Sequence, residues 1–103
     1  KKIIAFEKSY HGVTVASASL TGLPAMHAHF DLPTKALGVL RAATPHYYHG
    51  QINGESESEF VKRLVNDVEA LILREGQETI AAFIAGPVGG AAGVMATLGS
   101  DYF

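Results

Sequence analysis

Tyr10, His11 and Gly12 follow directly on a short apolar run, and their side chains suit the binding of a flat, polar ligand. A tyrosine ring can stack on an aromatic group, and an imidazole can donate or accept a hydrogen bond near neutral pH. Residues 2–7 have the length and β-branched content of a buried strand. Residues that follow the carboxyl end of a strand lie where open α/β sheets bind ligands. The three residues also fit an ordinary packed corner, so they do not establish a function alone.

A second candidate is the glycine-rich loop 86–93, which begins Gly86-Pro87-Val88. Glycines let the backbone approach a ligand closely because they have no Cβ. The loop is neither a P-loop nor a GxGxxG motif, because it lacks the residues that define them. It follows residues 79–85, whose continuous apolar character predicts a parallel strand buried on both faces. We therefore expect residues 10–12 and 86–88 to face one crevice at the carboxyl edge of a sheet.

Histidines provide a different possible chemistry. Four of the five lie between residues 23 and 54, as the pairs His27 and His29, and His46 and His49. Imidazole is the commonest metal ligand, and residues 27 and 29 share one face if that segment is a strand. However, no HExxH-type helix accompanies the pairs. We assign no metal ligand, and a histidine-based metal protein stays an alternative.

The clearest predicted element is a helix over residues 57–75. Ser56 and Glu59 fit a capping box at its start, and Gly76 lies where a helix C′ residue belongs. Charged residues lie mostly on the opposite side from an apolar stripe, which predicts that the stripe packs on a core. The stripe consists of Phe60, Leu64, Val68, Leu71 and Ile72.

Two further segments complete the expected order of elements. Residues 13–20 are small and mostly apolar, which favours a helix pressed against a sheet, ended by Thr21, Gly22 and Pro24. Residues 23–54 contain prolines and glycines every few positions and predict turns and irregular pieces. A stretch of that length is usually functional or lies at an interface.

Composition argues against several classes of partner. The 103 residues carry a net charge of −2 with scattered basic residues, so we expect no nucleic-acid partner. No apolar run approaches the roughly 20 residues that span a bilayer, so we expect no membrane partner. The chain has no cysteine, which is compatible with a reducing compartment, and we expect a cytoplasmic location. Because the sequence begins in a strand-like run without Met, we also expect a segment of a longer protein.

Seven short motifs occur in a fixed order through nearly the whole chain. They are Tyr10-His11-Gly12, Ala18-Ser19-Leu20-Thr21-Gly22, Phe30-Asp31-Leu32-Pro33, Pro45-His46-Tyr47-Tyr48, Glu78 to Ala85, Pro87-Val88 and Gly90-Ala91. Together they resemble the class III aminotransferases, the pyridoxal-phosphate enzymes that include ω-aminotransferases and β-alanine or amine:pyruvate aminotransferases.

This resemblance implies an α/β fold, namely part of the large domain of a fold-type I aminotransferase with a mostly parallel sheet. It implies that Tyr10 stacks on the pyridine ring of pyridoxal 5'-phosphate and that His11 and Gly12 complete the same wall. It places Gly86, Pro87 and Val88 beside the cofactor and the substrate entrance. The implied partners are a small-molecule amine or ω-amino acid and a keto acid such as pyruvate, in a full-length enzyme that is a homodimer or larger.

Two departures bear on this expectation. Family members usually have an acidic residue where this chain has Gly86. In addition, none of the five lysines matches the catalytic lysine, and the aspartate and phosphate loop of the family lie outside the matched region. We therefore expect no catalytic residue here and no activity of the segment alone. A non-catalytic α/β binding or structural domain stays a second alternative.

Overall fold

The computed structural model describes residues 1–90, 95–96 and 102, and a three-stranded parallel sheet is at its centre. Strand β1 (Lys2–Phe6) lies between β2 (Gly38–Ala42) and β3 (Ile80–Ile84). The β1–β2 register is regular, whereas the β1–β3 register shifts between Lys2 and Ile3. Since all three strands are parallel, their carboxyl ends meet at one edge of the sheet.

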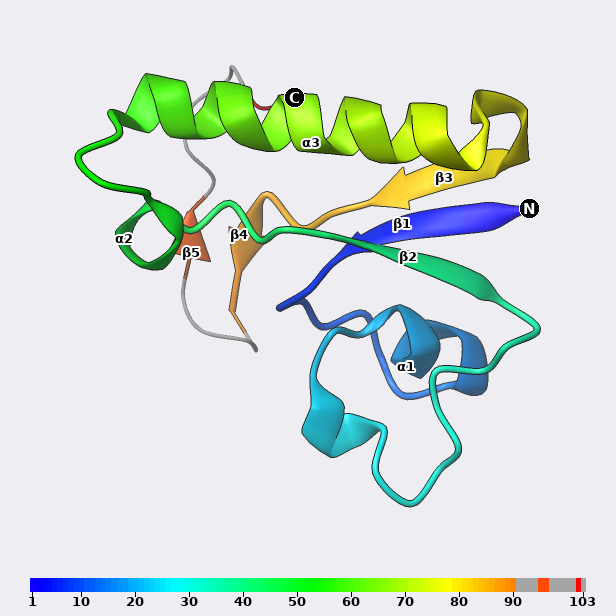
Figure 1. The fold of residues 1–103 in the computed structure, drawn as a ribbon. Helices are drawn as coiled ribbons and strands as arrows, with labels where there is room; N and C mark the ends of the chain where they lie inside the picture. The colour runs from blue at the N-terminus through cyan, green and yellow to red at the C-terminus, as the bar shows by residue number, and fades with distance from the viewer. Residues whose placement is uncertain (91–94, 97–101, 103) are drawn as a thin grey trace.

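Helices cover the two faces of this sheet. The chain passes from β1 through α1 (Val15–Leu20) to β2, and then through α3 (Glu57–Glu75) to β3, on the other side of β1. Right-handed crossovers that run in opposite directions place their helices on opposite faces. Figure 1 shows this arrangement, with α3 above the sheet and α1 below it. The order β2-β1-β3 creates a topological switch point between β1 and β3.

The hydrophobic core lies between the sheet and α3. Ile4 and Phe6 of β1 are buried against the apolar stripe of the helix, where Leu64 and Leu71 are buried as the sequence predicts. The ring of Phe6 also makes an edge contact with Phe83 of β3, with centroids 5.3 Å apart. The helix therefore has the phase expected from its periodicity.

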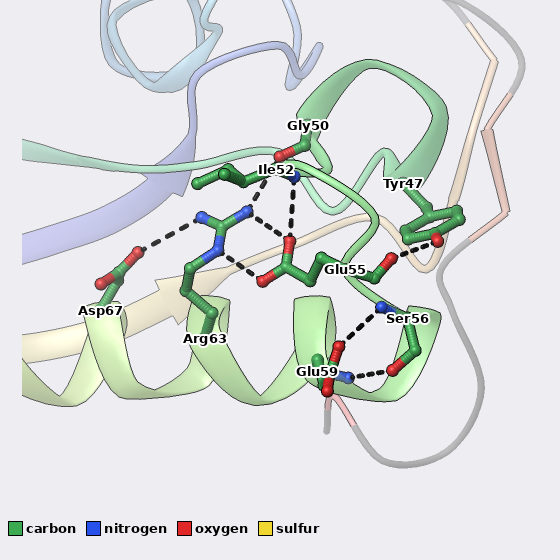
Figure 2. A network of polar contacts seen from close by, with 8 residues as sticks. All are labelled: Tyr47, Gly50, Ile52, Glu55, Ser56, Glu59, Arg63 and Asp67. Carbon is green, nitrogen blue, oxygen red and sulfur yellow. Dashed lines mark hydrogen bonds and ion pairs between the residues drawn. The ribbon is translucent and has the colours of Figure 1, made fainter.

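Helix α3 has the bounds and both ends that the sequence predicts. The Ser56 hydroxyl accepts a hydrogen bond from the Glu59 amide at 3.2 Å, and the Glu59 carboxylate accepts one from the Ser56 amide at 2.8 Å. Figure 2 shows this capping box. At the other end Gly76 has a φ of +86°, a left-handed value that glycine adopts without strain.

A polar cluster around Arg63 joins the first turns of α3 to the preceding loop and to the short helix α2 (Tyr47–Gly50). The guanidinium donates to both carboxylate oxygens of Glu55, at 2.8 and 3.0 Å, and to the Gly50 carbonyl at 2.9 Å. Asp67, one turn further along α3, lies 4.0 Å from the same guanidinium. This Arg63 cluster fixes the loop on which α3 starts.

The irregular stretch expected over residues 23–54 is wrong in its middle. It contains β2 as well as the 3₁₀ turn η1 (Pro24–Met26) and helix α2. Gly38 and Arg41 interrupt the short apolar run of β2, so local propensity gives a weak strand signal. Pairing with β1 over five residues makes this segment a strand, and that interaction is not local.

The third strand, which the sequence predicts to be buried on both faces, exposes apolar side chains in this chain, so that prediction stays open for the longer protein. Ala81, Ala82 and Phe83 are exposed, because β3 is an edge strand among the described residues and only β1 pairs with it. The remaining differences are at element ends. Strand β1 stops at Phe6, the first helix starts at Val15, and the turn η2 (Gln77–Thr79) precedes β3.

The glycine-rich segment is not wholly a loop. Val88–Gly89 forms the short strand β4, which pairs antiparallel with β5 (Met95–Ala96), while residues 91–93 lie outside the described part. Glycine-rich composition predicted a loop, but backbone pairing with β5 decides the local structure. Among the described helices, none combines the length and apolar character that crossing a membrane requires.

Candidate functional site

The candidate site is the corner formed by Tyr10, His11 and Gly12 just past the carboxyl end of β1. Hydrogen bonds fix the backbone on both sides of Tyr10. The Gly22 amide donates to the Ser9 carbonyl at 2.8 Å, and the His11 amide donates to the Thr21 hydroxyl at 2.9 Å. The corner is therefore held against the end of α1.

The Thr21 hydroxyl is fully buried and sits at the centre of these contacts. Besides accepting from the His11 amide, it lies 3.0 Å from the Ser17 carbonyl and 3.3 Å from the Gly12 carbonyl. One hydroxyl proton can serve one of these two acceptors at a time. Thr21 thus connects the last turn of α1 with the backbone of His11 and Gly12 in the corner.

Two glycines allow the chain to take this path. Gly12 has a φ of +117°, which residues with a side chain rarely adopt. Gly22 approaches β1 so closely that a Cβ would lie 2.0 Å from the Glu7 carbonyl oxygen and 2.6 Å from that of Phe6. No side chain fits there without moving the end of β1.

The corner presents an aromatic ring and an imidazole. The Tyr10 side chain is 45% exposed, so its ring is available to a ligand. The Nε2 atom of His11 is buried and has no hydrogen-bond partner among the described residues. Burial, and secondarily the charge of Arg41, lowers the pKa of His11. A lowered pKa favours the neutral imidazole, which offers one donor and one acceptor.

Arg41 of β2 contacts the ends of β1 and α1, the two elements beside the corner. Its guanidinium donates to the carbonyls of Ser19 at 2.8 Å and Thr21 at 2.9 Å, and also to that of Leu20. A longer contact of 3.3 Å reaches the carbonyl of Phe6, the last residue of β1. Burial lowers the pKa of Arg41, and the charge of Glu7 raises it in part. One side chain thus ties three elements together at the carboxyl edge of the sheet.

These bonds also complete the end of α1. The last carbonyls of a helix have no partner within it and attract cations. Arg41 serves those of Ser19, Leu20 and Thr21, while Nε2 of His27 donates to the Ala18 carbonyl at 2.9 Å. His27, a candidate metal ligand in the sequence, therefore acts as part of a helix cap.

The other histidines are not arranged around a common centre. The rings of His46 and His49 stack with centroids 4.6 Å apart, and Nδ1 of His46 accepts from the His49 amide at 3.3 Å. Across residues 1–90, 95–96 and 102, no group of three or more His, Cys, Asp or Glu side chains could hold a metal ion. The histidine-based metal alternative finds no support in this part of the chain.

The second predicted segment starts at the same edge. Gly86, Pro87 and Val88 follow β3, and β3 pairs with β1, so the two candidate segments leave neighbouring strands in the same direction. Val88 is exposed, and among the described residues a Cβ on Gly86 would meet only the Val88 carbonyl oxygen, 4.0 Å away. Packing within the described part of the chain therefore does not require this glycine, in contrast to Gly22.

Sequence reasoning missed the residues that support the corner. The local pattern predicts only a helix stop at Thr21 and Gly22, and it places Arg41 in an irregular region. A signal did exist, because Arg41 is the only charged residue in the run Gly38-Val39-Leu40-Arg41-Ala42. A cation inside a short apolar run indicates a strand whose charge meets buried acceptors.

Comparison with known proteins places this arrangement in a family. The family model "Aminotransferase class-III" matches residues 1–102. The "Gamma-aminobutyrate transaminase 1, mitochondrial" of Oryza sativa subsp. indica is 60% identical over 95 residues, which are 92% of this chain and 18% of that protein. The "Vanillin aminotransferase" of Capsicum chinense is 58% identical over 95 residues, 92% of this chain and 20% of that protein.

Solved structures of transaminases are also similar to this chain. A structure described as "Transaminase with L-ala" superposes with a TM-score of 0.92 at 51% identity, covering 99% of this chain and 23% of that one. The ω-transaminase from Pseudomonas jessenii in complex with PMP gives a TM-score of 0.91 at 50% identity, covering 99% and 22%. The chain thus spans about a fifth of the length of the curated relatives it matches.

The comparison corrects one prediction. The similar transaminases of Oryza sativa and Solanum lycopersicum are mitochondrial by name. The prediction of a cytoplasmic location is therefore wrong. It rested on a composition without cysteine, and such a composition bears on redox conditions and not on the organelle.

Proposed function

Because this chain belongs to the class-III aminotransferases, we propose that it is a segment of an enzyme that transfers an amino group from an amine or ω-amino acid to a keto acid such as pyruvate. The donor becomes a carbonyl compound and the keto acid becomes an amino acid. The full-length enzyme is a homodimer or a larger oligomer. The apolar surface that β3 exposes in this chain is covered there by further parts of the enzyme.

The cofactor in this proposal is pyridoxal 5'-phosphate, which supplies an electron sink for the transfer when bound. The described residues fit one side of such a group. A half-exposed tyrosine ring matches a flat heteroaromatic ring, and the buried, unpartnered Nε2 of His11 matches a polar substituent. Tyr10 would stack on the ring, and His11 and Gly12 would complete the wall. The observation that carries the proposal is this pinned corner at the switch point between β1 and β3.

Gly86, Pro87 and Val88 are proposed to line the substrate side of the same crevice. Their support is the pairing of β3 with β1, which starts both segments at one edge. With glycine at position 86, this wall offers no carboxylate to a cationic substrate group at that point.

Catalytic residues are proposed to come from other parts of the enzyme. Lys2 pairs with Glu75 and is the first residue of β1, and Lys1 donates to the Glu78 carbonyl. Both lie at the amino edge of the sheet, opposite the corner. This position argues against a catalytic role for Lys1 and Lys2.

The test uses the full-length enzyme with Tyr10 changed. A stacked aromatic pair contributes about 0.5–1.5 kcal/mol beyond area burial, so Tyr10→Ala should weaken cofactor binding several-fold to about tenfold. Tyr10→Phe keeps the ring and should bind nearly as well as wild type. The measurement is an absorbance titration of cofactor-free enzyme with pyridoxal phosphate, followed by transamination of a simple amine with pyruvate. Equal binding by Tyr10→Ala and wild type would remove Tyr10 from the site, and wild-type enzyme without transamination would contradict the function.

A further inference from the structure

The bonding of Arg41 is unusual for a partly buried cation. Its hydrogen-bond partners within the described part of the chain are all backbone carbonyls, and none is a carboxylate. Removing a guanidinium from water costs free energy, and neutral acceptors return less of it than an ionised partner does. An apolar side chain at this place would leave these carbonyls without the partner that Arg41 provides. The positions of these carbonyls relative to one another therefore depend on Arg41.

That geometry concerns the end of β1, from which the corner starts, and the end of α1, against which the corner is held. Residues 7–14 leave β1 at Phe6 and enter α1, and Arg41 contacts the Phe6 carbonyl together with the last three carbonyls at the end of α1. It thereby sets the separation between the strand end and the helix end. Thr21, whose carbonyl Arg41 holds, receives the His11 amide on its hydroxyl. A chain of contacts thus runs from β2 through Thr21 to the residue next to Tyr10.

We propose that Arg41 and Thr21 are positioning residues that hold the Tyr10-His11-Gly12 corner in the conformation that receives the cofactor ring; this inference rests on the proposed function. Neither residue touches the cofactor in this proposal. Arg41 aligns the ends of β1 and α1, and Thr21 transmits that alignment to the His11 backbone. The expected defect is in cofactor binding and orientation.

The experiment compares Arg41→Met with Arg63→Met in the full-length enzyme. Both changes remove a guanidinium that has several oxygen partners, but Arg63 contacts Glu55 and Gly50 before the start of α3 and no residue of β1 or α1 in these bonds. Arg41→Met should raise the dissociation constant of pyridoxal phosphate about tenfold or more and change the visible circular dichroism of the bound cofactor. Arg63→Met should leave both unchanged while lowering the unfolding midpoint of the cofactor-free enzyme.

A second pair of variants acts on Thr21. Thr21→Val keeps the shape and removes the hydroxyl that accepts from His11, so it should weaken cofactor binding about threefold to tenfold. Thr21→Ser keeps the hydroxyl and should restore the wild-type constant and dichroism. This pair decides the question if Arg41→Met does not fold.

The outcomes distinguish a failure of the proposed function from a failure of the inference about Arg41 and Thr21. Wild-type enzyme that binds no pyridoxal phosphate overturns the proposed function and this inference together. If wild-type enzyme binds pyridoxal phosphate and Arg41→Met has the same dissociation constant and dichroism as wild type, the inference alone is overturned. Equal dissociation constants and dichroism in Thr21→Val and Thr21→Ser also overturn the inference alone. A loss of binding in Arg41→Met that Arg63→Met matches shows a general loss of stability and also overturns it.

Discussion

Arg41 and Arg63 each gather several oxygen atoms, but their surroundings differ. Arg63 lies on α3 and pairs with the carboxylates of Glu55 and Asp67, with one carbonyl added (Figure 2). Arg41 lies on β2 and bonds only carbonyls among the described residues, at the ends of β1 and α1. The Arg63 cluster neutralises its charges locally and stabilises a loop. The Arg41 contacts leave a cation next to a candidate ligand site, where its field acts on His11.

The comparison extends to the way each region is packed. The corner depends on close backbone approach, with Gly22 against β1, whereas α3 depends on buried side chains such as Leu64. Where two backbone segments touch, there is no room for an added atom, whereas removing atoms from a side-chain core lowers stability in proportion to the cavity left. We therefore expect one added methyl group in the corner to lower the free energy of unfolding the most.

The largest expected effect is that of Gly22→Ala. The added Cβ would lie 2.0 Å from the Glu7 carbonyl oxygen, so the end of β1 must move, at a cost of about 3 kcal/mol or more. Gly86→Ala is the matched control, because within residues 1–90, 95–96 and 102 its Cβ meets only one atom, 4.0 Å away. Chemical unfolding of the full-length enzyme measures both variants. Similar stability of the two would show that the close approach at Gly22 is relieved easily.

Next in size is Leu64→Ala on α3. Leu64 is 3% exposed, and core Leu→Ala changes cost about 2–5 kcal/mol. Leu73, on the same helix, is 67% exposed in this chain, so Leu73→Ala should cost only about 0.5 kcal/mol. Equilibrium unfolding curves of the full-length enzyme give both values. A large cost for Leu73→Ala would show that another part of the enzyme covers that side of α3.

A smaller expected effect is on the pKa of His11, which should respond to Arg41 and not to Arg63. Arg41→Met should raise the pKa of His11, because it removes the positive charge that lowers that pKa after burial. Burial, the larger cause, remains, so the pKa should stay below its ordinary value. Histidine NMR signals of the full-length enzyme followed against pH, with His11→Gln for assignment, measure the shift. Arg63→Met should leave the His11 titration unchanged, and an equal shift in both variants would contradict the local effect of Arg41.

The smallest effect concerns acid stability of the Arg63 cluster. The hydrogen bond from Arg63 is the main cause that lowers the pKa of Glu55. A depressed carboxyl pKa stabilises the folded state above the unfolded pKa and is lost as pH falls through the folded pKa. Glu55→Gln should therefore flatten the decline of the unfolding midpoint from about pH 5 to about pH 3. An equally steep decline in Glu55→Gln and in wild type would contradict this role of the Arg63 cluster.

The order of motifs in the sequence determined the family, and the match over residues 1–102 confirms it. The α/β class with a parallel sheet is likewise confirmed by the agreement with transaminase structures. Helix α3 was predictable in phase and at both ends, because its periodicity, capping box and terminal glycine are local signals. Its packing partners were not, since they come from β1.

Only the tertiary structure decided the remaining points. Strand β2 exists because it pairs with β1, although its own residues are weak strand formers. The exposure of β3 follows from its place at the edge of the described sheet. The support of the corner by Arg41, Thr21 and Gly22 joins residues 10 to 35 positions apart, through backbone amides and carbonyls that every sequence possesses. Because a carbonyl carries no mark of residue type, no pattern in the sequence identifies which ones a buried arginine will reach.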